Sequence, residues 1–228
     1  MSTQLPSPFA SARLQYRAIR QPQDLAVFEA INSDVHGYQN SNFSNIKLPT
    51  TDDATKFMKA TAEEGLLGAI IWLPHPPTGM SAEEQDAEFQ RRRQNGEIVE
   101  GWGTAVGEIH LSLLPPHQSQ HRNTEIGLDI LPPYQGRGYG SEAINWVLDY
   151  AFCRAGLHKV RIRAFGWNVR AIALYERLGF TVEGRERESF WHEGMWWDGV
   201  YLGMLEGEWW GVVRKAEEQG TEEEKESS

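Results

Sequence analysis

The sequence is poor in cysteine and contains no long hydrophobic run. Cys153 is the only cysteine among 228 residues, so no disulfide can form within the chain and a reducing compartment is expected. No run of about 18 apolar residues occurs, which argues against a membrane-spanning helix. The first residues also lack the hydrophobic centre of a signal peptide. These absences predict a cytoplasmic location, with the nucleus left open, and no membrane partner.

Positive charge is scarce as well. The chain has 22 Lys and Arg against 32 Asp and Glu, a net charge of −10. Non-specific nucleic-acid binding depends on basic surfaces, so no nucleic-acid partner is expected, whereas a cationic substrate suits an acidic protein. Residues 216–228 contain six glutamates and one lysine, a composition typical of a disordered acidic tail.

Hydrophobic periodicity predicts an α/β fold with a mixed, mostly antiparallel central sheet and flanking helices. The expected order of elements is β-α-α-β-β-β-α-β-α-β-β. Strands are expected at 14–20, 66–73, 104–114, 124–131 and 158–165, and a hairpin near 192–194; helices are expected at 22–32, 50–65, from the glycines to about 154, at 168–179 and after 206.

The domain boundaries follow from composition. Residues 1–13 form an N-terminal extension in this interpretation, and 14–215 form a single domain that is a monomer or a homodimer. Residues 74–98 contain three prolines near their start and then mixed charges. We interpret them as an exposed insertion that leaves room for one helical turn or more in its middle, and we favour loose surface decoration over a lid.

The stretch "LPPYQGRGYGSEA" carries the first chemical signal. Pro132 and Pro133 lack amide hydrogens and end a strand. Gly136, Gly138 and Gly140 permit positive φ and close backbone approach just before a helix begins. Such a loop favours a phosphate or pyrophosphate, although a turn that only changes chain direction is the alternative. It is neither a P-loop nor a dinucleotide fingerprint, which would need glycine at Ser141.

Two segments together resemble the GNAT superfamily of acyl-coenzyme A N-acyltransferases. "YQGRGYGSEA" resembles its Gln/Arg-x-x-Gly-x-Gly/Ala signature at Gln135, Gly138 and Gly140. "NVRAIALYERLGF" resembles its second segment, and the matching residues are Asn168, Ala171, Tyr175, Gly179 and Phe180. The chain that follows is similar to the RimJ/RimL-like branch. The resemblance covers about residues 14–210 and implies an N-acetyltransferase that uses acetyl-CoA.

The resemblance also implies roles for particular residues. The loop would bind the pyrophosphate of coenzyme A with the amides of Gln135, Gly136, Arg137, Gly138, Tyr139, Gly140 and Ser141. The backbone of Leu128 and Ile130 would pair with the pantetheine arm, and an amide near Ile130 would stabilise the oxyanion. Asn168 would contact the pantetheine, cap its helix, or both. Tyr175 would protonate the leaving thiolate, which is feasible because a thiol has a pKa of about 8.5 and a tyrosine about 10.

The base that deprotonates the amine is less well defined. Glu108 and Glu125 are the strand carboxylates expected nearest the cleft, with Asp129 and His110 as further candidates. Each could act through a water, and each could equally be a solvent-facing residue or an ion-pair partner. The histidines of "HQSQH" (117–121) lie in a predicted loop without supporting ligands, so no metal is expected.

The predicted reaction is direct transfer of an acetyl group, through a tetrahedral intermediate, to a primary amine. The acceptor is a polyamine, an amino sugar, an amino acid or a peptide α-amine, and the sequence does not distinguish among them. A non-catalytic acyl-CoA-binding or sensing module on the same fold is the main alternative. An unrelated nucleotide-binding protein is a third hypothesis. Cys153 is interpreted as a packing residue rather than an acyl carrier.

Overall fold

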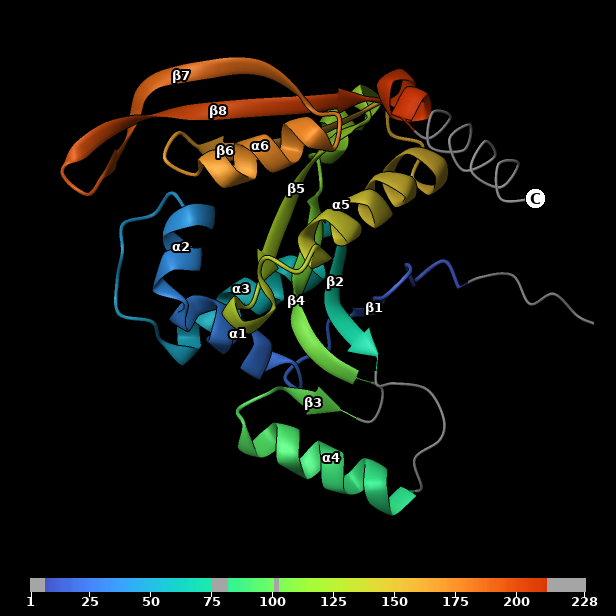
Figure 1. The fold of residues 1–228 in the computed structure, drawn as a ribbon. Helices are drawn as coiled ribbons and strands as arrows, with labels where there is room; N and C mark the ends of the chain where they lie inside the picture. Colours follow the sequence, from blue (N-terminus) through green and yellow to red (C-terminus); the bar gives the residue numbers. More distant parts are fainter. Residues whose placement is uncertain (1–6, 75–81, 101–102, 213–228) are drawn as a thin grey trace, which may run out of the picture. The chain divides into compact units, whose positions relative to one another are not determined.

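The computed structural model describes residues 7–74, 82–100 and 103–212. Its contacts divide the chain into two compact units, each described below by itself (Figure 1). Unit 1 comprises Met1–Leu113 and Gly127–Trp146, and unit 2 comprises Leu114–Ile126 and Val147–Ser228. The predicted acidic tail lies outside the described residues, and the division into an extension, one domain and a tail stays a prediction.

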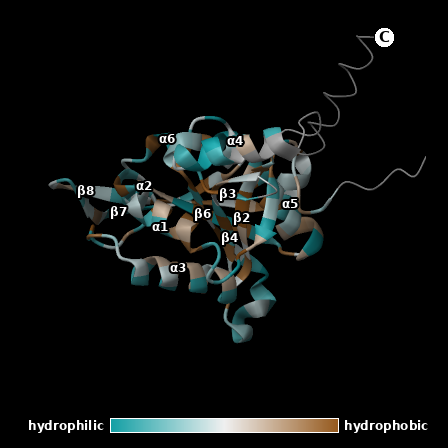
Figure 2. Cartoon of the chain, turned by 90° about the horizontal axis from the view of Figure 1, so that it is seen from below, coloured by the Kyte–Doolittle hydropathy of each residue, from teal (hydrophilic) through white to brown (hydrophobic). Residues whose placement is uncertain are grey.

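Unit 1 contains an antiparallel group of strands. β1 (Gln15–Ala18) pairs with β2 (Gly65–Pro74), β2 pairs with β4 (Gly103–Ser112), and the short β3 (Val99–Glu100) also pairs with β4. The centre of β2 is apolar and fully buried, which drives its packing through loss of water-exposed hydrocarbon surface. Figure 2 shows the region of β2 and β4 largely in hydrophobic colours.

Three helices of unit 1 precede β2. α1 (Leu25–Ser33) buries Val27, Phe28 and Ile31, and α3 (Thr51–Glu63) starts at Thr50, whose hydroxyl accepts the amide of Asp53 at 3.1 Å. These helices confirm the prediction. α2 (Val35–Ser41) was not predicted; it has no buried residue and therefore no apolar periodicity to reveal it.

The predicted insertion at 74–98 contains helical structure in its middle, as expected. Its described part forms α4 (Ala82–Gln94), followed by β3, so it adds a helix of 13 residues and a strand to the predicted order. The insertion was expected to be exposed, and most of the described side chains of α4 are exposed. Periodicity could not fix the bounds of this helix because it lacks a strong apolar face. Residues 75–81 lie outside the described residues.

Unit 2 contains the second group of strands. The first residues of β5 (Asn123–Ile130) pair in parallel with β6 (Lys159–Phe165), which pairs antiparallel with β8 (Met195–Leu205). β7 (Thr181–His192) forms a long antiparallel hairpin with β8 (Figure 1). The hairpin turns at Glu193 and Gly194, both at positive φ, as predicted.

The remaining helices follow the sequence expectations closely. α5 (Tyr139–Asp149) continues as a π-helical turn, Tyr150–Arg154, and α6 (Val169–Arg177) begins at Asn168. A last helix starts at residue 206 and is described to 212. The apolar face of α5 and of its continuation is buried throughout: Ala143, Ile144, Val147, Leu148, Ala151 and Phe152.

The fold class is therefore the predicted one, an α/β fold with a mixed, mostly antiparallel sheet and flanking helices. The parallel pair β5–β6 is joined through α5, as a crossover connection requires. Within the described residues, no helix combines the length and the apolar character that crossing a membrane would need.

Candidate active site

The glycine loop lies in unit 1 between the end of β5 and the start of α5. A short 3-10 turn, Pro132–Tyr134, ends the strand, and Gly136 and Gly138 adopt φ of +73° and +82°. Only glycine adopts such angles without strain. Among the described residues, no acceptor is found for the backbone amides of Gly136, Arg137 and Gly138. Exposed, unpaired amides before a helix N-terminus are suited to an anion.

The last predicted loop residues lie against the end of β5. A Cβ atom built on Gly140 would lie 3.5 Å from Leu128 Cδ2 and 3.8 Å from Ile130 Cγ1, so the start of α5 is close to the strand expected to carry the pantetheine arm. The Gln135 side chain donates through Nε2 to the carbonyl of Ile130 at 2.8 Å. The first signature residue thus ties the loop back to the strand that precedes it.

Arg13 is a site residue that the sequence reasoning missed. Its Nη1 donates to the carbonyl of Arg137 at 3.1 Å, and its Nε donates to Glu142 Oε2 at 2.8 Å. Its guanidinium also lies 4.8 Å from the centre of the Tyr139 ring, a cation–π distance. Arg13 comes from the predicted N-terminal extension, and no sequence motif links it to residues more than 120 positions later.

Two of the predicted base candidates meet in unit 1. Glu108 on β4 is fully buried, and its carboxyl group is hydrogen-bonded to that of Asp129 on β5. Ser41 at the end of α2 also hydrogen-bonds Asp129. Burial and the neighbouring Glu108 carboxylate together raise the pKa of Asp129 to about 7. The pair can therefore exchange a proton near neutral pH, as a general base must.

His110 completes this cluster. Its Nδ1 lies 3.0 Å from Glu108 Oε2, and its ring meets Phe57 edge to face with centroids 6.3 Å apart. The ring lies directly over Gly127, where a Cβ atom would come within 2.1 Å of His110 Cε1. Glycine at position 127 is thus required for the ring to occupy this place. Glu108, Asp129 and His110 form one hydrogen-bonded and packed group.

Asp129→Asn should stabilise the protein in a pH-dependent way. An aspartate ordinarily titrates near 3.9, and a raised folded-state pKa means that stability is lost as pH rises from about 4 to about 7. The slope is about 1.4 kcal/mol per pH unit over that window. Asparagine carries no such penalty, so melting temperatures should increasingly favour the variant from pH 4 to 7 and run parallel above about 7.5.

The exposed Asp52, on α3, provides the matched control for that melting series. Its side chain is 72% exposed in an ion pair with Lys56, so Asp52→Asn should show no such trend between pH 4 and 7. A constant offset between wild type and Asp129→Asn at every pH would contradict the raised pKa of Asp129.

The other predicted residues belong to unit 2. Glu125 forms an ion pair with Arg163, Oε1 to Nε at 3.0 Å, which matches the ion-pair alternative for this residue. Asn168 caps α6 by accepting the amide of Ala171 at 3.2 Å, so its capping role is present. Tyr175 is half-buried on α6, with its ring centroid 6.2 Å from that of Phe180.

Cys153 and the paired histidines do not form reactive centres of their own. Partial burial and the nearby Asp149 raise the pKa of the Cys153 thiol, which disfavours the nucleophilic thiolate. The "HQSQH" segment forms an exposed 3-10 turn, Pro116–His121. In the part of the chain that the structure describes, no group of three or more potential metal ligands is found.

Comparison with known proteins identifies the family to which a chain with this fold and this glycine loop belongs. A sequence model described as the acetyltransferase (GNAT) family matches residues 65–180, more than half of the 228 residues. The chain belongs to this family. The match runs from the first residue of β2 to Phe180 after α6, and so includes the glycine loop, the carboxyl pair and Tyr175.

Individual relatives cover shorter parts. YdaF of Bacillus subtilis (strain 168), whose name gives ribosomal N-acetylation as its assumed activity, is 36% identical over 109 residues, 48% of this chain and 58% of that protein. The spermidine N(1)-acetyltransferase of Vibrio cholerae serotype O1 is 35% identical over 89 residues, 39% of this chain and 51% of that protein. The chain thus spans little more than half the length of these curated relatives.

A solved structure shows the same fold over more of the chain. The crystal structure of spermidine N-acetyltransferase from Vibrio cholerae in complex with CoA and spermine superposes with a TM-score of 0.64. It covers 87% of this chain and 98% of that one, at 21% sequence identity. At this identity the likeness concerns the fold.

Proposed function

We propose that this protein is an N-acetyltransferase that moves the acetyl group of acetyl-CoA to a primary amine. The observation that carries the proposal is the glycine loop, with its unpaired amides at Gly136, Arg137 and Gly138, at the end of β5. Membership of the acetyltransferase family supports it. The loop fits a pyrophosphate because it presents amides and a helix N-terminus without a competing acceptor.

In this mechanism the loop from Gln135 to Ser141 binds the pyrophosphate, and the backbone of Leu128 and Ile130 holds the pantetheine arm. Acetyl-CoA supplies the thioester carbonyl that the amine attacks. An amide near Ile130 donates a hydrogen bond to the oxyanion. Such a donor stabilises the developing negative charge most when the protein already holds it in position before the reaction. The carbon–sulfur bond then breaks, and Tyr175 protonates the departing thiolate.

The amine must be neutral before it attacks. An alkyl ammonium has a pKa of about 10.4, so at neutral pH it has to lose a proton to the protein or to water. The Glu108–Asp129 pair is the best-supported acceptor, because its carboxyls share one environment and Asp129 titrates near neutrality. A water between the ammonium and the pair would carry the proton. Glu125 is less suited because its carboxylate is occupied by Arg163.

The acceptor proposed is a soluble cationic amine, such as a polyamine, or else a peptide α-amine. The acidic balance of the chain and the buried carboxyl pair favour a cation. The relative named for spermidine acetylation points the same way. The continuation after Phe180 and the relative named for ribosomal acetylation favour the RimJ/RimL-like branch, within which a peptide α-amine would be the acceptor.

A panel of amines tests the proposal through release of free thiol from acetyl-CoA. Polyamines, amino sugars, amino acids and short peptides should include at least one acceptor that is turned over with saturation kinetics. Tight binding of coenzyme A without turnover of any amine would favour a non-catalytic acyl-CoA-binding module. Equal competition by ADP and coenzyme A would favour an unrelated nucleotide-binding protein.

A further inference from the structure

We propose that the described part of the insertion, residues 82–98, holds the coenzyme loop in place through the hydrogen bond between Glu97 and Tyr134. The inference rests on the proposed function, since it assigns the pyrophosphate to the loop. It gives the insertion a task in substrate binding, and it makes Tyr134 a positioning residue for acetyl-CoA.

Tyr134 occupies the turn that leads from β5 into the loop. Its side chain is buried, and its hydroxyl donates to Glu97 Oε2 at 3.1 Å. Its amide donates to the carbonyl of Leu131 at 2.9 Å, which closes the turn. Burial and the Glu97 carboxylate raise the pKa of Tyr134 to about 12, so the phenol keeps its proton and remains a donor to Glu97 at physiological pH.

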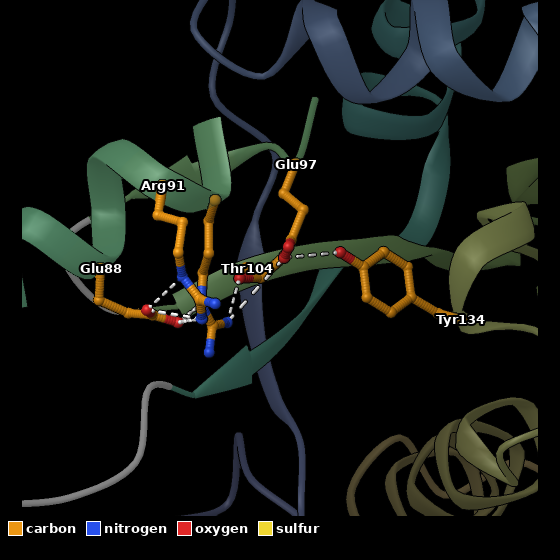
Figure 3. A network of polar contacts seen from close by, with 6 residues as sticks. Glu88, Arg91, Glu97, Thr104 and Tyr134 are labelled. Carbon is orange, nitrogen blue, oxygen red and sulfur yellow. Dashed lines mark hydrogen bonds and ion pairs between the residues drawn. The ribbon is translucent and has the colours of Figure 1, made fainter. Parts of the chain in front are cut away.

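Glu97 is itself fixed by the insertion helix (Figure 3). Arg92 on α4 donates through Nε to Glu88 Oε1 at 2.8 Å and through Nη1 to Thr104 Oγ1 at 3.1 Å. The same Nη1 lies 4.0 Å from Glu97 Oε2. Thr104 is fully buried on β4. The chain of contacts therefore runs from the insertion helix through Arg92 and Glu97 to the turn before the loop, and Thr104 anchors Arg92 to β4.

The contact continues into the loop. The guanidinium of Arg137 lies over the Tyr134 ring, 5.9 Å from its centre, within cation–π range. Arg137 is exposed in the loop itself. A fixed Tyr134 therefore holds the turn that leads into the loop, and its ring supports the guanidinium of Arg137. A loop held in its binding geometry loses less conformational entropy when the ligand arrives.

Tyr134→Phe removes only the hydroxyl group and should weaken use of acetyl-CoA. We expect KM for acetyl-CoA to rise about ten-fold, a loss typical of one hydrogen bond to a charged group, with kcat within two-fold of wild type. S-acetylpantetheine lacks the pyrophosphate, so its kcat/KM should be the same for variant and wild type. A purely structural role would lower activity with both thioesters.

Variants at Glu97 test the same hydrogen bond independently, from the side of its acceptor. Glu97→Gln keeps an oxygen acceptor and should stay close to wild type, whereas Glu97→Ala should reproduce the ten-fold rise and add little to Tyr134→Phe. Tyr201→Phe is the matched control, because it deletes the same kind of bond, from Tyr201 to Glu186 Oε2 at 2.7 Å, in the β7–β8 hairpin. Its KM for acetyl-CoA should not change.

Calorimetric titration with coenzyme A separates the two hypotheses. If wild type binds coenzyme A and both Tyr134→Phe and Glu97→Ala bind it equally well, the positioning role is wrong and the proposed function stands. Equal losses with acetyl-CoA and S-acetylpantetheine would also overturn it. Absence of coenzyme A binding by wild type would overturn the proposed function and this inference together.

Discussion

Replacing Tyr175 by phenylalanine should lower kcat about 100-fold, at the lower end of the range for loss of a general acid. KM for acetyl-CoA and for the amine should change less than three-fold, because the aromatic ring at position 175 on α6 keeps its place beside Phe180. Under the proposed mechanism, the substitution removes only the proton donor for the departing thiolate. Steady-state thiol release at saturating concentrations of both substrates measures the effect.

Two results would decide against this role for Tyr175. Unchanged turnover in the phenylalanine variant would remove the general acid from α6 and leave protonation of the thiolate to solvent. A parallel rise of both KM values with unchanged kcat would show that the hydroxyl contributes to binding rather than to the chemical step. The circular dichroism spectrum of the variant should match that of wild type, because the loss of a single hydroxyl group should leave the secondary structure unchanged.

Glu108→Gln should lower kcat/KM for the amine about 100-fold at pH 7, since Asp129 would lose the neighbouring carboxylate that helps to raise its pKa and would become a weaker proton acceptor. The deficit should shrink towards pH 10, where an amine of pKa about 10.4 supplies much of its own neutral form. A pH series with one good acceptor amine measures this convergence. The variant keeps the shape of the side chain and can still hydrogen-bond Asp129, so folding should be preserved.

Glu125→Gln is the comparison that assigns the base. Its carboxylate is engaged by Arg163, and we expect it to lose much less activity than Glu108→Gln at pH 7. A larger loss at Glu125 that also disappears at high pH would move the base to that strand residue. A Glu108→Gln deficit that is the same at pH 7 and pH 10 would instead indicate a structural role for the buried carboxyl.

The elements that the sequence predicted correctly are those with a local signal. The helix α5, the capping role of Asn168 and the hairpin turn near Gly194 each follow from residues within a few positions. The motif around Gly138 located the loop for the same reason. α2 escaped prediction because it buries nothing, and the bounds of α4 were not predicted because its charged sequence has no apolar stripe.

The contacts that build the candidate site are long-range and could not be read from the chain. Glu108 and Asp129 meet because β4 and β5 lie in a particular register, and Ser41 joins them from α2. Sequence alternation placed each carboxylate on a strand but did not place the two against each other. Glu97 and Tyr134 are 37 positions apart, in segments without any shared pattern.

The hydrogen bond from Arg13 to the carbonyl of Arg137 also fixes the orientation of the peptide plane between Arg137 and Gly138. That carbonyl and the amide of Gly138 belong to one planar trans peptide and point opposite ways, so the amide is turned away from Arg13. A version of the chain shortened to start at Leu14 would keep every residue of both family motifs. It would nevertheless release this peptide plane and leave Glu142 without its cation, so sequence matching alone would underestimate how much of the protein is needed to receive an anion.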